Sequence, residues 1–244
     1  MDFIFDLYGT LADVCTDETP DAFWDAASKE ASALGAPYTG EAFRTAYLAL
    51  CADEVQKRAE EMPEVPIEFV EPELLNVFIR LLRDRGAEPE NAAVLARRFR
   101  ERSTLWIRPM PHAIETLDEL KKRGDRTFLL SNAQSCFTVW ELESVGIAKK
   151  FDGILLSSDA GMKKPYIGLF ELLLSRYGID RENAVMVGND AIADIGGASA
   201  AGLLSRYVHT WSSGDRPKTL PDTCREIGDL SELPGSCRAI KRGC

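Results

Sequence analysis

Polar side chains follow several short apolar stretches of this sequence. Each stretch has the length and composition typical of a strand that is buried on both faces. The polar groups are Asp6, the pair Ser131 and Asn132, the pair Lys163 and Lys164 (one loop further on), and the pair Asn189 and Asp190. Because parallel strands end on one edge of a sheet, where ligands bind, we expect these groups to form one site.

This set of side chains suits attack on an electrophile that carries negative charge. Asp6 could act as a nucleophile and form a covalent intermediate that water later hydrolyses. Ser131 and a lysine could bind the oxygens of the anion and neutralise the charge that builds in the transition state. Asp6 with Asn189 or Asp190 could hold a hard divalent cation through oxygen ligands, and Mg²⁺ is the best match.

Each of these residues also has a structural alternative. Asp6 and Asp190 could stabilise turns, and Ser131 and Asn132 could cap the helix that follows them. For Asp194, four residues after Asp190, two roles stay open. It could belong to the metal site, or it could accept hydrogen bonds from loop amides.

The apolar stretches alternate with helical patterns in the second half of the chain. We expect strands at residues 3–5, 128–130, 154–156, 184–187 and 203–208, with a short edge strand near Ile227 and Leu230. Helical spacing of apolar residues predicts helices between these strands. Such alternation requires right-handed crossovers and indicates an α/β fold with a parallel sheet.

Residues 19–106 show helical spacing throughout and no convincing strand. We expect four helices there, the second capped by Thr39 and the fourth carrying Leu95, Phe99 and Trp106 on its inner face. Residues 12–18 look polar and turn-like. We therefore expect a core domain of residues 1–14 plus 108–244, and a helical domain of residues 15–107 inserted after the first strand to cover the site.

Composition narrows the classes of function. The 244 residues carry a formal net charge of −10, which argues against nucleic acid and anionic membrane surfaces as partners. No apolar stretch approaches the ~20 residues that a membrane span needs. The six cysteines include no CxxC pair, and the chain starts without a signal-peptide pattern, so we expect free thiols and a cytoplasmic protein. It could be a monomer or a homodimer.

The ordered motifs FDLYGTL, LLSNA, KKP and VGND, the last followed by Asp194, resemble those of the haloacid dehalogenase superfamily. The resemblance covers roughly residues 1–208, and the helical insert looks like the C1 cap of subfamily I. It implies a Rossmann-like, doubly wound parallel sheet with strand order 5-4-1-2-3. The activity it implies is hydrolysis of a small anionic substrate through an aspartyl intermediate.

The resemblance also implies roles for particular residues. Asp6 would be the nucleophile, Ser131 an anion binder together with Thr10 and Asn132, and Lys164 the positive anchor. Lys163 is the alternative lysine, but the motif lysine normally adjoins the proline. The metal ligands would be Asp6, the backbone carbonyl of Tyr8, and Asn189 or Asp190.

Two motifs point to different chemistries. The phosphatases of the superfamily usually carry an acid where this chain has Tyr8, whereas the 2-haloacid dehalogenases carry tyrosine there, because a halide needs no proton. Arg44 resembles the arginine with which those dehalogenases hold the carboxylate of the haloacid. In contrast, Asn189, Asp190 and Asp194 resemble the metal-binding forms.

We therefore weigh three hypotheses. The first is Mg²⁺-dependent hydrolysis of a phosphate monoester, with good leaving groups favoured because position 8 lacks an acid. The second is a metal-independent 2-haloacid dehalogenase. The third is a catalytically weak or non-catalytic binding protein that has kept the pocket.

Overall fold

A six-stranded parallel sheet lies at the centre of the larger part of the molecule in this computed structural model, which describes residues 1–236. Its strands, in spatial order, are β5 (Gly153–Leu156), β4 (Arg126–Ser131), β1 (Asp2–Phe5), β6 (Ala184–Gly188), β7 (Leu204–Val208) and β8 (Cys224–Ile227). The order of the first five, read from β7 to β5, is the predicted 5-4-1-2-3. The α/β fold and the edge strand near Ile227 are likewise confirmed.

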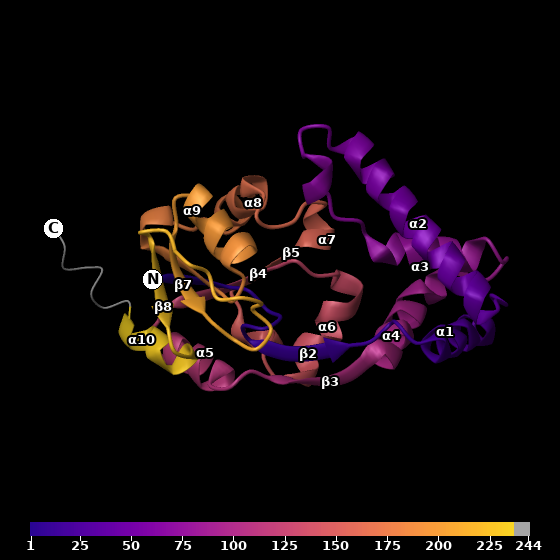
Figure 1. The fold of residues 1–244 in the computed structure, drawn as a ribbon, viewed down its shortest axis with the longest axis horizontal. Coiled ribbons are helices and arrows are strands. Elements are labelled where there is room, and N and C mark those ends of the chain that lie inside the picture. The colour runs from indigo at the N-terminus through magenta and orange to yellow at the C-terminus, as the bar shows by residue number, and fades with distance from the viewer. Residues whose placement is uncertain (237–244) are drawn as a thin grey trace.

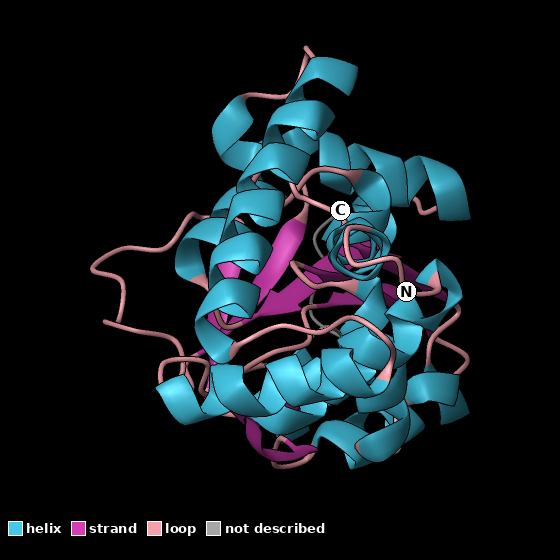
Figure 2. Ribbon diagram, turned by 90° about the vertical axis from the view of Figure 1, so that its right-hand side faces the viewer, coloured by secondary structure: helices cyan, strands magenta, loops and turns pink. Residues whose placement is uncertain are grey.

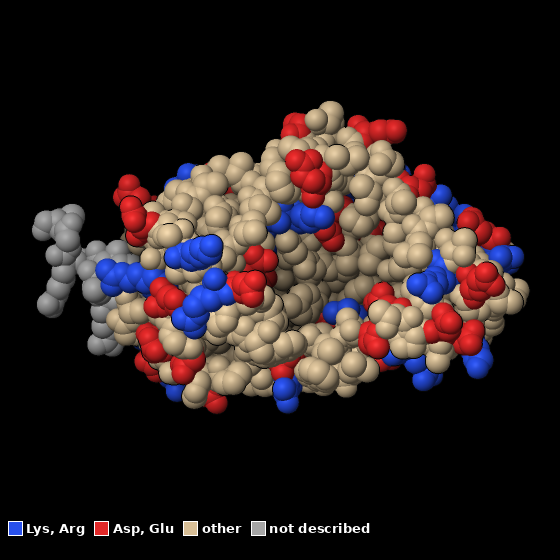
Figure 3. Space-filling model, in the orientation of Figure 1, with Lys and Arg blue, Asp and Glu red and all other residues tan. Residues whose placement is uncertain are grey.

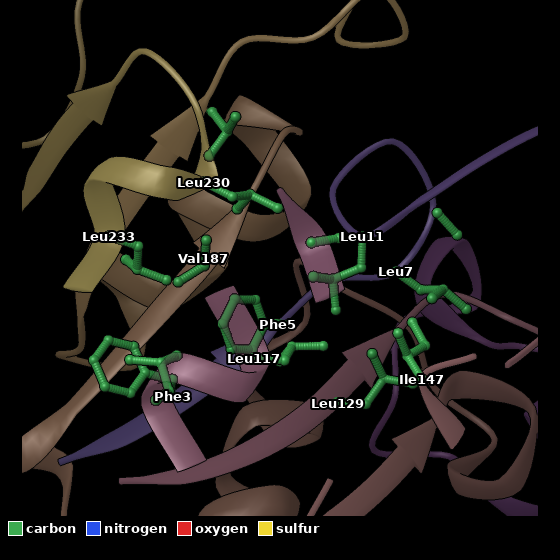
Figure 4. Packing of buried hydrophobic residues seen from close by; sticks show 14 of the residues in the cluster. Phe3, Phe5, Leu7, Leu11, Leu117, Leu129, Ile147, Val187, Leu230 and Leu233 are labelled. Carbon is green, nitrogen blue, oxygen red and sulfur yellow. The ribbon is translucent and has the colours of Figure 1, made fainter. Parts of the chain in front are cut away.

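Helices cover both faces of this sheet (Figure 2). One face carries α5 (Ala113–Lys122), α6 (Ser135–Ser144) and α10 (Leu233–Ser236), and the other carries α8 (Ile167–Tyr177) and α9 (Gly197–Ala200). Side chains alternate along β1, so that Phe3 and Phe5 pack on the first face and Ile4 on the second. Figure 4 shows Phe3 and Phe5 surrounded by leucines of the first face. Because both faces are covered, β1 can be apolar without interruption.

The insert between β1 and α5 lies beside the sheet-bearing part (Figure 1) and forms a second hydrophobic cluster of its own side chains, with Phe137 of α6. Its helices are α1 (Asp21–Ala33), α2 (Gly40–Glu61), α3 (Leu74–Arg83) and α4 (Ala92–Ser103). Thr39 caps α2 as predicted, since its hydroxyl accepts a hydrogen bond from the Ala42 amide at 3.2 Å. Phe99 lies fully buried at the middle of the cluster, among aromatic rings of α1, α2, α3 and α6.

Short elements complete the fold. These are α7 (Ser157–Ala160), the π-helical turn η5 (Ala191–Gly196), and the 3₁₀ turns η1 (Ile67–Phe69), η2 (Pro89–Asn91), η3 (Ala148–Lys150), η4 (Arg181–Asn183) and η6 (Leu230–Glu232). Among residues 1–236, no helix has both the length and the apolar character to cross a bilayer. Cys15, Cys51, Cys136 and Cys224 are free thiols, whereas Cys237 and Cys244 lie outside the described residues.

The expectation of a turn at residues 12–18 and of a helix through Trp106 was wrong. Residues 12–16 form β2 (Ala12–Thr16), which pairs antiparallel with β3 (Thr104–Pro109). Trp106 therefore lies on a strand and is 41% exposed, with its indole N–H donating to Asp13. Each strand is stabilised by a partner about ninety residues away, and local spacing carries no sign of that pairing.

The β2–β3 ribbon joins the sheet-bearing part to the insert (Figure 1). The expected boundaries of the helical domain, at residues 14/15 and 107/108, both fall within this ribbon. The molecular surface is hollowed between the two parts (Figure 3).

Candidate active site

A cavity of about 250 Å³ lies beyond the carboxyl ends of β1, β4 and β6. Most of the residues selected from the sequence line it, namely Asp6, Tyr8, Ser131, Asn132, Lys164, Asn189 and Asp190, and Asp194 lines it too. The register explains this, because Phe5, the last residue of β1, pairs with Leu129 of β4 and Val187 of β6. The residues that follow each strand therefore come out at the same edge.

The loop after β1 turns tightly enough to hold Asp6 at this edge. Gly9 has a φ of +83°, and a side chain at this position would place its Cβ 2.2 Å from the Ser212 hydroxyl oxygen. Only glycine accepts both the left-handed backbone and the close approach. Asp6 itself is anchored by its amide, which donates to the Val187 carbonyl at 3.0 Å.

Lys164 joins the two buried carboxylates of the site. Its ammonium donates to Asp6 Oδ1 at 2.8 Å, to Asp194 Oδ1 at 2.6 Å and to the Leu130 carbonyl at 2.8 Å. Burial disfavours the charged ammonium, but the two carboxylates outweigh that effect and raise the pKa of Lys164. All three ammonium hydrogens thus have acceptors, and the amine stays charged at neutral pH.

Ser131 and Asn132 have different roles at the end of β4. The Ser131 hydroxyl donates to Asp6 Oδ1 at 3.1 Å. The Asn132 side chain instead pairs with the backbone of Lys164, donating to its carbonyl at 3.0 Å and accepting from its amide at 2.8 Å. Asn132 therefore fixes the loop from which the lysine reaches Asp6.

Asp194 connects the lysine to the loop after β6. Its Oδ2 accepts from the Asp190 amide at 2.9 Å, while its Oδ1 takes the Lys164 ammonium. Burial raises the pKa of Asp194, and the adjacent ammonium opposes that rise. Of the two roles left open for Asp194, these contacts match the hydrogen-bonding one.

Asp190 and Asn189 use most of their polar atoms within the protein. Asp190 Oδ1 accepts from the amides of Ile192 and Ala193, both at 2.8 Å, and so caps η5. The Asn189 amide nitrogen lies 3.2–3.4 Å from three hydroxyls, those of Thr210, Ser212 and Ser213.

The oxygen atoms that face Thr10 fit a hard cation. The Thr10 hydroxyl lies 3.1 Å from Asn189 Oδ1 and 3.4 Å from Asp6 Oδ2. One hydroxyl hydrogen satisfies only one of these acceptors, so the other is left for a different partner. A carboxylate and an amide oxygen are ligands that Mg²⁺ accepts.

This donor set has only one carboxylate besides Asp190, whose Oδ1 is already bonded. Among residues 1–236, no group of three or more histidine, cysteine, aspartate or glutamate side chains is arranged to hold a metal. A cation here would therefore need neutral ligands such as Asn189 Oδ1 and the backbone carbonyl of Tyr8.

The Tyr8 phenol is bonded away from acid–base chemistry. It donates to Glu141 Oε2 in a short hydrogen bond and lies 3.0 Å from the Thr138 hydroxyl. Burial and the Glu141 charge raise the pKa of Tyr8 above its ordinary value. A phenol that is harder to ionise and already donates to a carboxylate is a poor general acid for a leaving group.

Sequence reasoning missed the residues behind Tyr8. Arg100 of α4 donates to Glu141 Oε1 at 2.7 Å, which pairs the insert with α6, and its guanidinium lies 5.9 Å from the Tyr8 ring centre. Thr138 and Glu141 are three residues apart and share one face of α6. That polar pair beside Phe137 was the available signal, but it does not name Tyr8 as the partner.

Arg44, predicted to bind substrate, does not reach the cavity. Its guanidinium lies 3.6 Å from an Asp21 carboxylate oxygen and 5.7 Å from the centre of the Trp24 ring. Its side chain is 47% exposed, in a separate surface recess of the insert. The resemblance gave the position on α2 but not the direction in which α2 presents it.

The comparisons agree with this fold. The model of the haloacid dehalogenase-like hydrolase family matches residues 3–202. The chain therefore belongs to this family of hydrolases, and it is an enzyme of that class.

Curated relatives are phosphatases. A phosphoserine phosphatase of Thermus thermophilus is 34% identical over 158 residues, which are 64% of this chain and 62% of the relative. A glyceraldehyde 3-phosphate phosphatase of Methanothermobacter thermautotrophicus is 38% identical over 104 residues, 43% of this chain and 46% of the relative. The chain thus spans only about half to three-fifths of the length of these relatives.

Solved structures share the fold over almost the whole chain. A phosphatase of this superfamily from Thermococcus onnurineus superposes with a TM-score of 0.60 at 20% identity, covering 96% of both chains. A magnesium-bound structure of YfnB from Bacillus subtilis gives 0.55 at 20% identity, covering 97% of this chain and 98% of the other. A 2-haloacid dehalogenase from Pseudomonas syringae gives 0.56 at 24% identity and covers 96% of both. At these identities the likeness establishes the fold and does not choose between the two chemistries.

Proposed function

We propose that this hydrolase cleaves phosphate monoesters through a phosphorylated Asp6. The observation that carries the proposal is the asymmetry of the Asp6 carboxylate. Lys164 and Ser131 both donate to Oδ1, whereas Oδ2 has only the distant Thr10 hydroxyl as a partner. One oxygen is thereby held in place and the other is left to attack.

The reaction has two steps in this proposal. Asp6 Oδ2 attacks phosphorus, and the bond from phosphorus to the ester oxygen breaks, so that the alcohol departs with the electron pair of that bond. Water then attacks the acyl phosphate and releases inorganic phosphate and the free carboxylate. Lys164 stays bonded to Asp6 Oδ1 and Asp194, and its charge stabilises the phosphoryl group electrostatically. The Ser131 hydroxyl would turn from Asp6 Oδ1 to a phosphoryl oxygen when substrate binds.

Mg²⁺ is the proposed cofactor, held by Asp6, the Tyr8 carbonyl and Asn189, with Asp190 beside them. Asp6 Oδ2 would contact the cation before substrate binds, and the same oxygen would then attack phosphorus. When bound, it would neutralise the repulsion between the Asp6 carboxylate and the phosphoryl oxygens. Residues 15–107 are proposed to be a C1-type cap on a core of residues 1–14 and 108–244, and the hollow between the two parts supports this (Figure 3).

The test is phosphate release from p-nitrophenyl phosphate with and without Mg²⁺. We expect activity that chelation abolishes and that Asp6→Asn lowers by about a thousandfold or more, since covalent catalysis is lost. Asp159→Asn, the same change at an exposed carboxylate outside the cavity, is the control. Phosphate release that survives complete chelation would rule out the Mg²⁺ version, and full turnover in Asp6→Asn would rule out the nucleophile.

A 2-haloacid dehalogenase is the second candidate because of Tyr8. This residue puts a neutral side chain where a phosphatase of this superfamily usually has a carboxylate. This candidate predicts chloride release from 2-chloropropionate without metal. The placement of Arg44 speaks against it, since its guanidinium pairs with Asp21 rather than entering the cavity. No halide release from a panel of haloacids would eliminate it.

A further inference from the structure

Trp211 forms part of the wall of the Asp6 cavity, yet its side chain is 63% exposed. A large indole left in water at the edge of a polar pocket is unusual, because burying it would be favourable. Trp106 lies beside it and is 41% exposed, with the ring centres 6.4 Å apart and the planes tilted by 50°. The two indoles give the cavity an aromatic rim on one side.

Trp106 is held by a hydrogen bond of its own indole, and Trp211 lies on a loop whose neighbouring residues contact Asn189. The Trp106 N–H donates to Asp13 at 3.0 Å, and Arg108, which also donates to Asp13, places its guanidinium 6.0 Å from the Trp106 ring centre. Trp211 sits between Thr210 and Ser212, whose hydroxyls both lie within 3.4 Å of the Asn189 amide nitrogen. The loop that carries Trp211 is therefore placed beside Asn189, one of the residues near Asp6.

The cavity is too small to enclose a whole organic substrate, so residues at its edge can contact the leaving group. About 250 Å³ lined by Asp6, Ser131, Lys164 and Asn189 is below the usual ~300–1,000 Å³ of sites that enclose a whole organic ligand. It suits the phosphoryl group and little more. The rest of a substrate would extend out of the cavity, and Val14 and Trp211 are among the few apolar side chains in its lining.

We propose that Trp211, supported by Trp106, selects phosphate monoesters whose leaving group carries a flat aromatic ring, by stacking on that ring. This inference rests on the proposed phosphatase function and names its substrate class. A nucleobase or a benzyl ring offers the face that an indole prefers, whereas a short polyol offers only hydroxyls.

The test compares uridine 5′-monophosphate with ribose 5-phosphate, because both release a ribose 5-alkoxide and differ in the base. We expect kcat/KM to favour the nucleotide, and Trp211→Ala to lower the ratio of the two values about tenfold, since stacking on one ring is worth about one decade. Trp211→Phe should keep most of the preference. Leu105→Ala, at a 61% exposed side chain next to Trp106, is the matched control and should leave the ratio unchanged.

A second pair of substrates separates the effect of a planar ring from that of an apolar one. Benzyl phosphate and cyclohexylmethyl phosphate release similar alkoxides, but only the first has a planar ring. A preference for benzyl phosphate that Trp211→Ala removes supports stacking. An equal fall for both esters overturns the proposal, because it marks a general structural or apolar role.

A binding measurement tests the role of Trp211 independently of whether the enzyme hydrolyses phosphate esters. In Asp6→Asn, titration calorimetry should show the nucleotide binding about tenfold more tightly than ribose 5-phosphate, and the added Trp211→Ala should remove the difference. If the wild type hydrolyses no phosphate monoester, the proposed function fails, and this binding result alone decides the inference. Equal binding of both ligands, or none of either, overturns it. The proposal is also overturned if Trp211→Ala leaves the ratio of the two kcat/KM values unchanged. This holds even if the substitution changes how the protein associates with itself, because such a change would mark Trp211 as a contact between copies.

Discussion

At the residue scale, the site depends on one ammonium between two carboxylates. Lys164 is 3% exposed, Asp194 1% and Asp6 7%. Removing one member of such a buried group is far more destabilising than the group itself is stabilising, because the remaining charges lose their only compensation.

Lys164→Met should therefore lower the free energy of unfolding by about 3–5 kcal/mol, because Asp6 and Asp194 would face each other without a cation. Urea denaturation followed by circular dichroism measures the loss. Lys163→Met is the neighbouring control and should cost much less, because no ion pair or side-chain hydrogen bond of Lys163 is found among the described residues. Adding Asp194→Asn to Lys164→Met should restore part of the stability. Equal losses from the two lysines would contradict this account.

Tyr8 gives a second prediction at this scale. Because its phenol donates to Glu141, Tyr8→Phe should leave the dependence of log kcat/KM on leaving-group pKa unchanged. Tyr8→Asp should flatten that dependence and raise turnover of alkyl esters by about a hundredfold, since it adds a general acid. A series of substituted phenyl phosphates gives the slope. A changed slope in Tyr8→Phe would identify the phenol itself as the acid.

At the scale of elements, α6 links the sheet to the insert. Glu141 of α6 is 1% exposed in its side chain, and Arg100 of α4 is its ion-pair partner, with 14% of its side chain exposed. The same carboxylate also accepts from Tyr8. One buried glutamate therefore connects the loop of the nucleophile, a helix of the sheet layer and a helix of the insert.

Arg100→Met should lower the free energy of unfolding by about 3 kcal/mol, because Glu141 would stay buried without its cation. Arg97→Met is the matched control. It makes the same change of side chain on the same helix, but the i,i+4 ion pair that it removes, with Glu101, is exposed to solvent. That control should cost about 0.5 kcal/mol or less. Thermal and urea melts of both variants decide the matter, and similar losses would show that the Arg100–Glu141 pair is no more than a surface contact.

At the scale of the whole molecule, an aromatic side chain of α6 anchors that helix in the hydrophobic cluster of the insert. Phe137 belongs to α6, but its ring packs in the cluster of the insert, 6.1 Å from Phe78 and 6.4 Å from Phe99 between ring centres. The insert and the sheet-bearing part should therefore unfold together in a single calorimetric transition.

Phe137→Ala should lower the stability by about 3–5 kcal/mol and split the transition in two, because it removes the shared side chain. Val139→Ala, on the exposed side of the same helix at 61% exposure, should leave one transition. Differential scanning calorimetry distinguishes the outcomes. A single transition in Phe137→Ala would mean that the remaining contacts, among them the β2–β3 ribbon and the Arg100–Glu141 pair, are enough to couple the two parts.

Much of the fold and most of the site follow from local sequence. Apolar stretches such as Phe3–Phe5 are long enough only for strands buried on both faces, so the strands, their parallel direction and the edge at which they end could be predicted. The order of the strands came from the resemblance. Asp6, Ser131 and Lys164 meet because they follow those strands closely. A residue close behind the end of a buried parallel strand lies at the carboxyl edge of the sheet whatever the rest of the chain does.

Tertiary structure alone decided the directions and partners of the remaining side chains. It paired β2 with β3, turned Arg44 toward Asp21, bonded the Tyr8 phenol to Glu141 and set Trp211 at the rim. Each of these depends on a contact between elements far apart in the chain. The physical reason is that the spacing of apolar residues in the sequence specifies which face of a helix or strand is buried. Which other element covers that face depends on how the two surfaces pack, and this is not encoded in local spacing.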